Sequence, residues 1–199
     1  MELKDKKRVK NILEMFIIAI MANVTMQLVL LPKEMFTRSV VALFAIVAVS
    51  VYIKRKKIMS DISLKDVKYT ILGAIGCILL QEGIGIVFGA AENIPMEIVK
   101  TEDMLYMAVV TLIIAPIVEE SVFREIFKEK LGEFLPCIVL IVVNGVFFAG
   151  FHFVAEPVVF VVLMVCGAVM MYCYLKTGKL FTSIGIHFLL NVYAFRGLF

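Results

Sequence analysis

Two carboxylates, two imidazoles and one guanidinium stand out because they lie in or beside apolar stretches of the chain. Glu119, Glu120 and Arg124 follow a long apolar stretch. The two histidines of the chain, His152 and His187, also lie in apolar stretches. Carboxylates and imidazoles are common general acids and bases, and charged residues at bilayer depth are functional candidates because burying them is costly. These residue types predict a reaction centre in an apolar environment.

The spacing of the first group suggests a division of labour. Successive residues of an α-helix are about 100° apart, so Glu120 and Arg124 share a face and can form an ion pair. Glu119 points elsewhere and is free to act as a general base toward the site. A purely structural ion pair at a helix end would account for Glu120 and Arg124. It would leave the second carboxylate unexplained.

Each histidine has a companion one helical turn away. Phe148 precedes His152 by four residues, and Asn191 follows His187 by four residues. The amide of Asn191 could orient the imidazole of His187 or donate to an oxyanion. Taken alone, His152 could be an interfacial residue, and the pair His187 and Asn191 could equally serve helix packing.

Composition indicates which elements must position these residues. The chain has 199 residues, of which 62% are hydrophobic, and a mean hydropathy of +0.99. A typical soluble domain is only about 45–50% apolar. We therefore predict an all-α, polytopic transmembrane bundle of about seven spans. It would form a single domain, 1–199, with a motif-bearing core at 104–196. The expected apolar segments are 11–31, 39–53, 68–91, 104–127, 135–154, 157–175 and 180–196.

Successive connections between the apolar segments alternate between many and few lysine and arginine residues. These residues gather at the N-terminus and again near 54–68, 124–130 and 176–179, whereas the other connections are poorer in them. Such residues prefer the cytoplasmic side. We therefore expect an integral membrane protein with a cytoplasmic N-terminus and an odd number of spans. The basic connections and small size suit a prokaryotic plasma membrane.

Three spaced motifs resemble those of one known family. The chain is similar to the CAAX prenyl protease and bacteriocin-processing family of intramembrane proteases, also called CPBP or Abi. The resemblance covers 119–191, more than a third of the chain. The matching motifs are Glu119-Glu120-x-x-x-Arg124, Phe148-x-x-x-His152 and His187-x-x-x-Asn191.

The resemblance implies hydrolysis of peptide bonds inside or at the edge of the membrane. It gives Glu119 and His152 the activation of a water molecule, while Glu120 and Arg124 hold the carboxylate pair in place. One position departs from the family pattern: Glu125 stands where many members have glycine. This residue adds a charge beside the expected site but occupies no matched catalytic position.

For the remaining motif residues, the resemblance implies stabilisation of a tetrahedral oxyanion by His187 and Asn191. Family members have also been labelled metalloproteases, and Glu119, His152 and His187 could form a three-ligand zinc site with one open position. The zincin motif His-Glu-x-x-His is absent from the sequence. We favour a metal-free mechanism, and zinc stays an open alternative.

Two other classes of function compete with a protease. A transporter or channel also places charges inside helices, although the sequence shows no convincing internal repeat. A catalytically silent scaffold or immunity protein could keep the same fold. For the protease, the expected partners are a peptide or membrane-protein substrate and the lipid bilayer, and we expect no nucleic acid.

One depth estimate conflicts with a shared site. At about 1.5 Å per residue, Glu119 and His187 lie roughly 14 Å and 12 Å from the cytoplasmic ends of their helices. The same count places His152 roughly 27 Å deep. A bend at 124–134, a helix that begins outside the hydrocarbon, or a strong tilt would each remove the mismatch.

Overall fold

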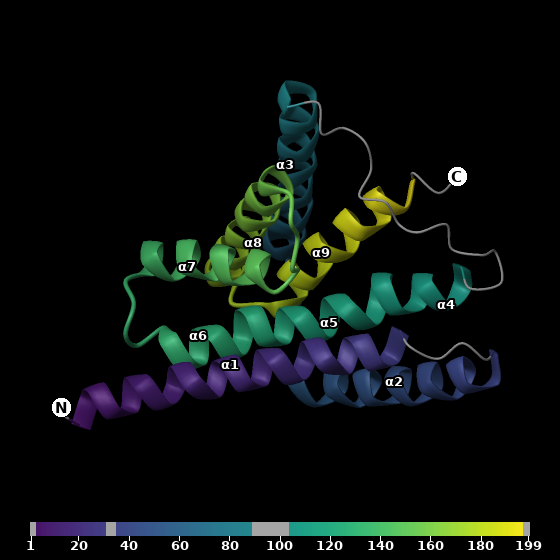
Figure 1. The fold of residues 1–199 in the computed structure, drawn as a ribbon, viewed down its shortest axis with the longest axis horizontal. Helices are drawn as coiled ribbons and strands as arrows, with labels where there is room; N and C mark the ends of the chain where they lie inside the picture. The colour runs from purple at the N-terminus through teal and green to yellow at the C-terminus, as the bar shows by residue number, and fades with distance from the viewer. Residues whose placement is uncertain (1–2, 31–34, 89–103, 197–199) are drawn as a thin grey trace.

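The computed structural model describes residues 3–30, 35–88 and 104–196, and within them the fold is entirely helical (Figure 1). The all-α class is therefore confirmed. The ends of the expected segments 11–31 and 68–91 lie outside the described residues. The elements are α1 (Leu3–Leu30), α2 (Met35–Lys56), α3 (Leu64–Phe88), α4 (Met104–Val109), η2 (Val110–Ile114), α5 (Ala115–Glu120), η3 (Ser121–Ile126), α6 (Phe127–Leu131), α7 (Cys137–Gly150), α8 (Pro157–Thr177) and α9 (Leu180–Phe195).

The elements from α4 to α6 form one continuous rod, Met104–Leu131, that contains two π-helical segments. These segments, η2 and η3, lie on either side of α5, which ends with the two glutamates. The N–H of Ala115 donates to the carbonyl of Val110, five residues earlier, and Pro116 follows directly. Proline has no N–H, so it cannot continue a regular α-helical ladder. π-Turns of this kind are frequent at functional sites.

Four described helices are long and apolar enough to cross a membrane, which fits the expected membrane bundle. The stretches are Asp5–Met26, Leu64–Phe88, Met104–Leu131 and Pro157–Thr177. The apolar helices α7 and α9 have 14 and 16 residues, fewer than the ~20 that a full crossing needs. The total of about seven spans therefore stays a prediction.

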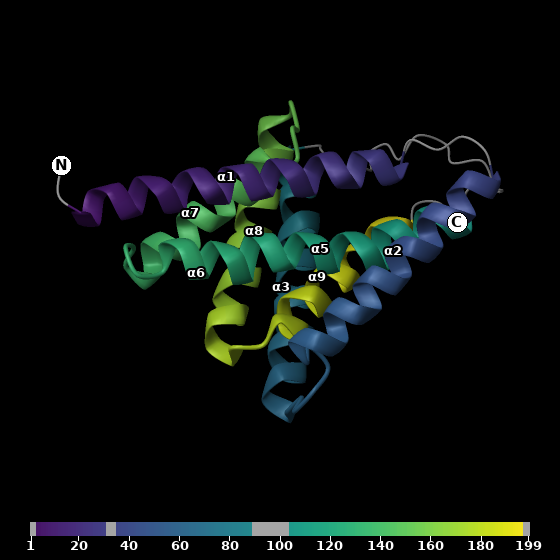
Figure 2. The same ribbon diagram turned by 90° about the horizontal axis from the view of Figure 1, so that it is seen from below.

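Helix α1 runs along the part of the rod from α5 to α6 in both ribbon views (Figures 1 and 2). Helices α3 and α8 lie at a steep angle to both α1 and the rod. Glycines bring α7 and α8 into close contact. A Cβ atom on Gly167 would meet the side chain of Phe148 at 3.0 Å, and one on Gly145 would clash with the backbone of α8. Small residues permit such close approach of membrane helices. This contact fixes the face of α7 that carries Asn144 and Phe148.

The basic connections lie on one side of the bundle, as the charge pattern predicts. A buried apolar cluster combines a residue from the N-terminal half of α1 with residues at the second, fourth and sixth connections: Met15, Ile58, Leu131 and Leu180. Ionic contacts also join them, such as Lys130 Nζ to Glu14 Oε2 at 2.6 Å. The common side is a property of the fold. Its assignment to the cytoplasm stays a prediction.

Candidate active site

The central feature of the site is a fully buried ion pair on the rod. Arg124 Nε lies 2.7 Å from Glu120 Oε2, and its Nη2 lies 3.2 Å from Glu120 Oε1. Both side chains have zero exposure. Cζ of Arg124 also lies 4.8 Å from the ring centroid of Phe148. The i, i+4 spacing predicted this partnership, and two-point contact makes it geometrically specific.

Asn144 is a further hydrogen-bond partner of Arg124 and is not among the residues predicted from the sequence. Its Oδ1 accepts a hydrogen bond from Arg124 Nη1, and its Nδ2 donates to the carbonyl of Phe123. The side chain is fully buried on α7. The available signal was a lone amide in an otherwise apolar stretch. A buried amide requires partners, so it pointed to a polar neighbour on another helix.

Glu119 lies between the two imidazoles. Its Oε2 is 3.9 Å from His152 Nε2 and 3.9 Å from His187 Nε2. This oxygen is buried and has no hydrogen-bond partner among the described residues. The Glu119 side chain as a whole is 23% exposed. The structure therefore brings together the three groups that the sequence placed far apart in the chain.

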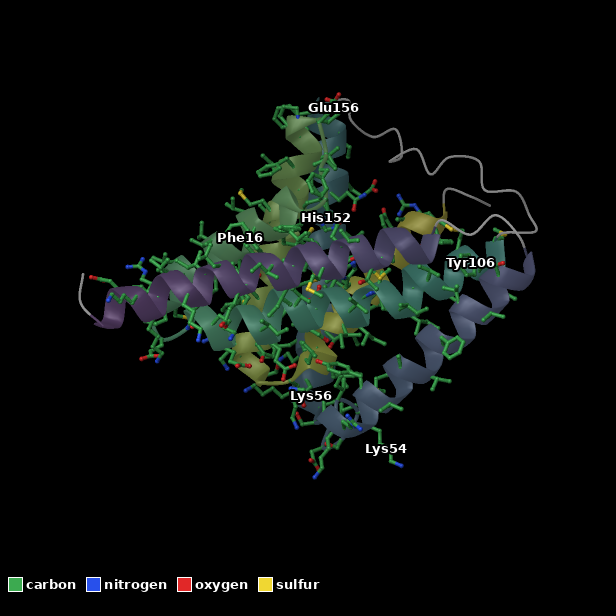
Figure 3. All side chains as sticks on the ribbon, turned by 60° about the horizontal axis from the view of Figure 1, so that its bottom comes forward. Phe16, Lys54, Lys56, Tyr106, His152 and Glu156 are labelled. Atoms are coloured by element: carbon green, nitrogen blue, oxygen red, sulfur yellow. The ribbon has the colours of Figure 1, made fainter. Side chains whose placement is uncertain are left out.

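His152 lies in the turn that ends α7, beside α1 near the middle of the bundle (Figure 3). Its Nδ1 is 2.8 Å from the carbonyl of Phe148, and the two rings are 4.5 Å apart. Asn23 of α1 supports the same turn by donating to the carbonyl of Phe151 at 3.2 Å. Because a carbonyl only accepts, Nδ1 of His152 carries the proton. A neutral ring then presents an Nε2 lone pair to Glu119.

His187 is linked to Arg124 through the carboxylate of Glu120. Its Nδ1 lies 3.0 Å from Glu120 Oε1 and therefore donates to this carboxylate. The ring is buried and meets Phe148 edge to face at 5.9 Å. The Arg124–Glu120 pair thus orients His187 so that its Nε2 faces Glu119.

Asn191 has a different observed contact from the ones expected. Its Nδ2 donates to the backbone carbonyl of Thr111 in η2, at 2.8 Å. The amide has a second N–H group, so this contact does not exhaust its donors. The observed bond links α9 to the rod eight residues before Glu119.

The depth conflict disappears when both helices are measured from the turn that joins them. Glu119 precedes the end of α6 by 12 residues, about 18 Å. The 14-residue α7 starts just after that turn and ends two residues before His152, about 20 Å along. The estimate for Glu119 was counted from Lys128, before the end of α6, whereas that for His152 was counted from Phe134, within the turn. An antiparallel hairpin brings the two residues to the same level.

Glu125 does not crowd the site. Its carboxylate contacts the hydroxyl of Tyr52 at 2.9 Å and Nζ of Lys56 at 3.0 Å, both on α2. The extra charge at the position where many family members have glycine therefore ties η3 to α2.

The described side chains do not present a preformed metal site. No group of three His, Cys, Asp or Glu side chains among the described residues is placed to hold one. Ligand atoms around tetrahedral zinc are roughly 3.3 Å apart, given bonds of about 2.0 Å. The separations of 3.9 Å at Glu119 are wider. Two atoms that are 3.9 Å apart can both lie about 2.8 Å from one shared water molecule.

Comparison with known proteins agrees with the motifs. Residues 101–193 match the Rce1-like family model. That family is described as type II CAAX prenyl endopeptidase, Rce1-like. The matched region contains every motif residue named above, so the resemblance is confirmed. The match indicates a CAAX-type intramembrane endopeptidase. No curated protein and no solved structure gives a significant match.

Proposed function

We propose that this protein is a membrane-embedded endopeptidase in which Glu119 and His152 activate water for attack on a peptide carbonyl. The supporting observation is the buried Glu119 Oε2, which has no partner among the described residues and faces two imidazole nitrogens at 3.9 Å. A buried carboxylate oxygen without a hydrogen bond is costly and calls for a donor. A water molecule can donate to this oxygen and also to an imidazole nitrogen 3.9 Å away from it.

The two bases can hold that water in a reactive orientation. The water donates one hydrogen to Glu119 and the other to the Nε2 lone pair of His152. Its oxygen lone pair is then directed at a substrate carbonyl. During attack, Glu119 accepts one proton and returns it to the amine as the peptide bond breaks, which balances the reaction.

His187 is positioned for the developing negative charge. Its Nδ1–H is held by Glu120, so a protonated ring directs Nε2–H outward to the tetrahedral oxyanion. The second N–H of Asn191 is a further candidate donor. These roles follow the family motifs residue by residue.

The first test is cleavage of a peptide library by the purified full chain in detergent, with and without a chelator. We expect cleavage to persist after chelation, because the ligand-atom spacing suits water rather than zinc. Activity that is lost on chelation and restored by zinc would overturn the metal-free mechanism. The same assay reveals the cleaved sequence.

The family resemblance also suggests a biological role, and the small size and basic connections suggest a location. We propose peptide processing or bacteriocin self-immunity in a prokaryotic plasma membrane, with a peptide or membrane protein as substrate. A prenylated CAAX substrate is one option within the family.

A further inference from the structure

Two asparagines donate to the two π-helical segments that flank the glutamates, one from each histidine-bearing helix. Asn191 of α9 contacts the carbonyl of Thr111 in η2, and Asn144 of α7 contacts the carbonyl of Phe123 in η3. We propose that Asn144 and Asn191 are positioning residues that clamp the rod in its π-helical register. The consequence for catalysis rests on the proposed function, whereas the clamp itself does not.

At η2, the helix cannot satisfy the carbonyl of Thr111 by itself. Its α-helical donor would be the N–H of Ala115, which instead donates to Val110. Its π-helical donor would be residue 116, which is proline and has no N–H. The amide of Asn191 supplies the missing donor from α9. Pro116 therefore leaves the Thr111 carbonyl without a donor from the helix, and Asn191 supplies one.

At η3, twelve residues later, the α-helical donor is again diverted, although residue 128 is a lysine and keeps its N–H. The N–H of Phe127 donates to the carbonyls of Val122 and Arg124 and so passes over Phe123, its α-helical partner. The Nδ2 of Asn144 donates to that carbonyl. The other end of the amide receives Arg124 Nη1. Asn144 thereby couples the backbone register of η3 to the arginine.

Register controls where the glutamates point. A π-turn takes one more residue than an α-turn, and each residue advances the helix by about 100°. Loss of the π-turn in η2 would rotate Glu119 by about that angle relative to Thr111. The carboxylate would then no longer face the two imidazoles. Because the clamps come from α7 and α9, they also fix the histidine-bearing helices against the same rod.

The decisive experiment is a double-mutant cycle on residues 116 and 191 of the full chain in detergent. We expect Asn191→Ala to lower the thermal midpoint by roughly 3–8 °C and to speed hydrogen exchange across 110–117. Adding Pro116→Ala restores a backbone N–H within reach of the Thr111 carbonyl. It should recover at least half of both effects. Strictly additive effects of Pro116→Ala and Asn191→Ala would overturn the clamp at η2.

Two matched variants test specificity. Asn144→Ala should speed exchange across 121–127, and Pro116→Ala should give it no rescue, since the restored N–H lies in the other segment. Thr182→Val removes a fully buried hydroxyl of α9 that has no partner among the described residues. It should leave the midpoint and the exchange of 110–117 unchanged. Rescue of Asn144→Ala, or faster exchange in Thr182→Val, would overturn the proposal.

Kinetics separate the clamp from direct oxyanion binding. If Asn191 positions the rod, Asn191→Ala lowers kcat with little change in KM, and Pro116→Ala partly restores kcat. If Asn191 acts only as an oxyanion donor, kcat falls without rescue and the thermal midpoint stays constant. That outcome overturns the clamp and leaves the proposed hydrolysis standing. Absence of any cleavage would overturn the proposed function, while the midpoint and exchange still decide the clamp.

Discussion

Replacing Glu119 with glutamine should abolish peptide cleavage while the protein still folds and inserts. The change preserves the size of the side chain but removes the base that takes the proton of the attacking water. A lost general base typically lowers the rate by about 10²–10⁴-fold. Stability should change little, because Glu119 Oε2 has no hydrogen-bond partner among the described residues. The measurements are kcat/KM on a cleaved peptide and the thermal midpoint in detergent.

The same helix offers a matched control. Glu125→Gln makes the identical substitution on a carboxylate that faces α2, so cleavage should persist. His152→Ala should abolish cleavage, as Glu119→Gln does. Unchanged biological activity in both site variants would favour a silent scaffold. Altered ion flux without proteolysis would favour a transporter.

Replacing Arg124 with methionine should destabilise the fold by about 3–5 kcal/mol, the usual cost of breaking a buried ion pair from one side. The variant leaves the Glu120 carboxylate buried with zero exposure and without its arginine. It also removes the hydrogen bond to Oδ1 of Asn144. The expected observations are a large fall in thermal midpoint and a low yield of folded protein in detergent.

A second substitution separates charge burial from catalysis. Combining Arg124→Met with Glu120→Leu removes both charges and should recover most of the lost stability. Cleavage should stay absent, because His187 loses the carboxylate that holds its Nδ1. Arg124→Lys should not restore full stability, since lysine cannot reproduce the two-point contact. A stable Arg124→Met single variant would contradict the role assigned to the pair.

Local helical geometry was readable from the sequence. Residues four apart share a helix face, so the pairing of Glu120 with Arg124 and the separate direction of Glu119 followed from spacing alone. The long apolar segments fixed the all-α membrane class, because only helices satisfy their own backbone within a single segment. Three ordered motifs were enough to identify the family resemblance. Each of these properties depends on residues within one helix or on their order in the chain.

Contacts between helices could not be predicted from the sequence. The partnership of Asn144 with Arg124 joins residues twenty positions apart and depends on how α7 packs against η3. The level of His152 depended on the turn that joins α6 to α7, which counting along separate helices ignored. In η2, the N–H that Pro116 lacks is a local feature, but the donor to the Thr111 carbonyl comes from Asn191 on α9. Periodicity describes one helix at a time. The register and depth of this site were set by packing among several, and only the tertiary structure decided them.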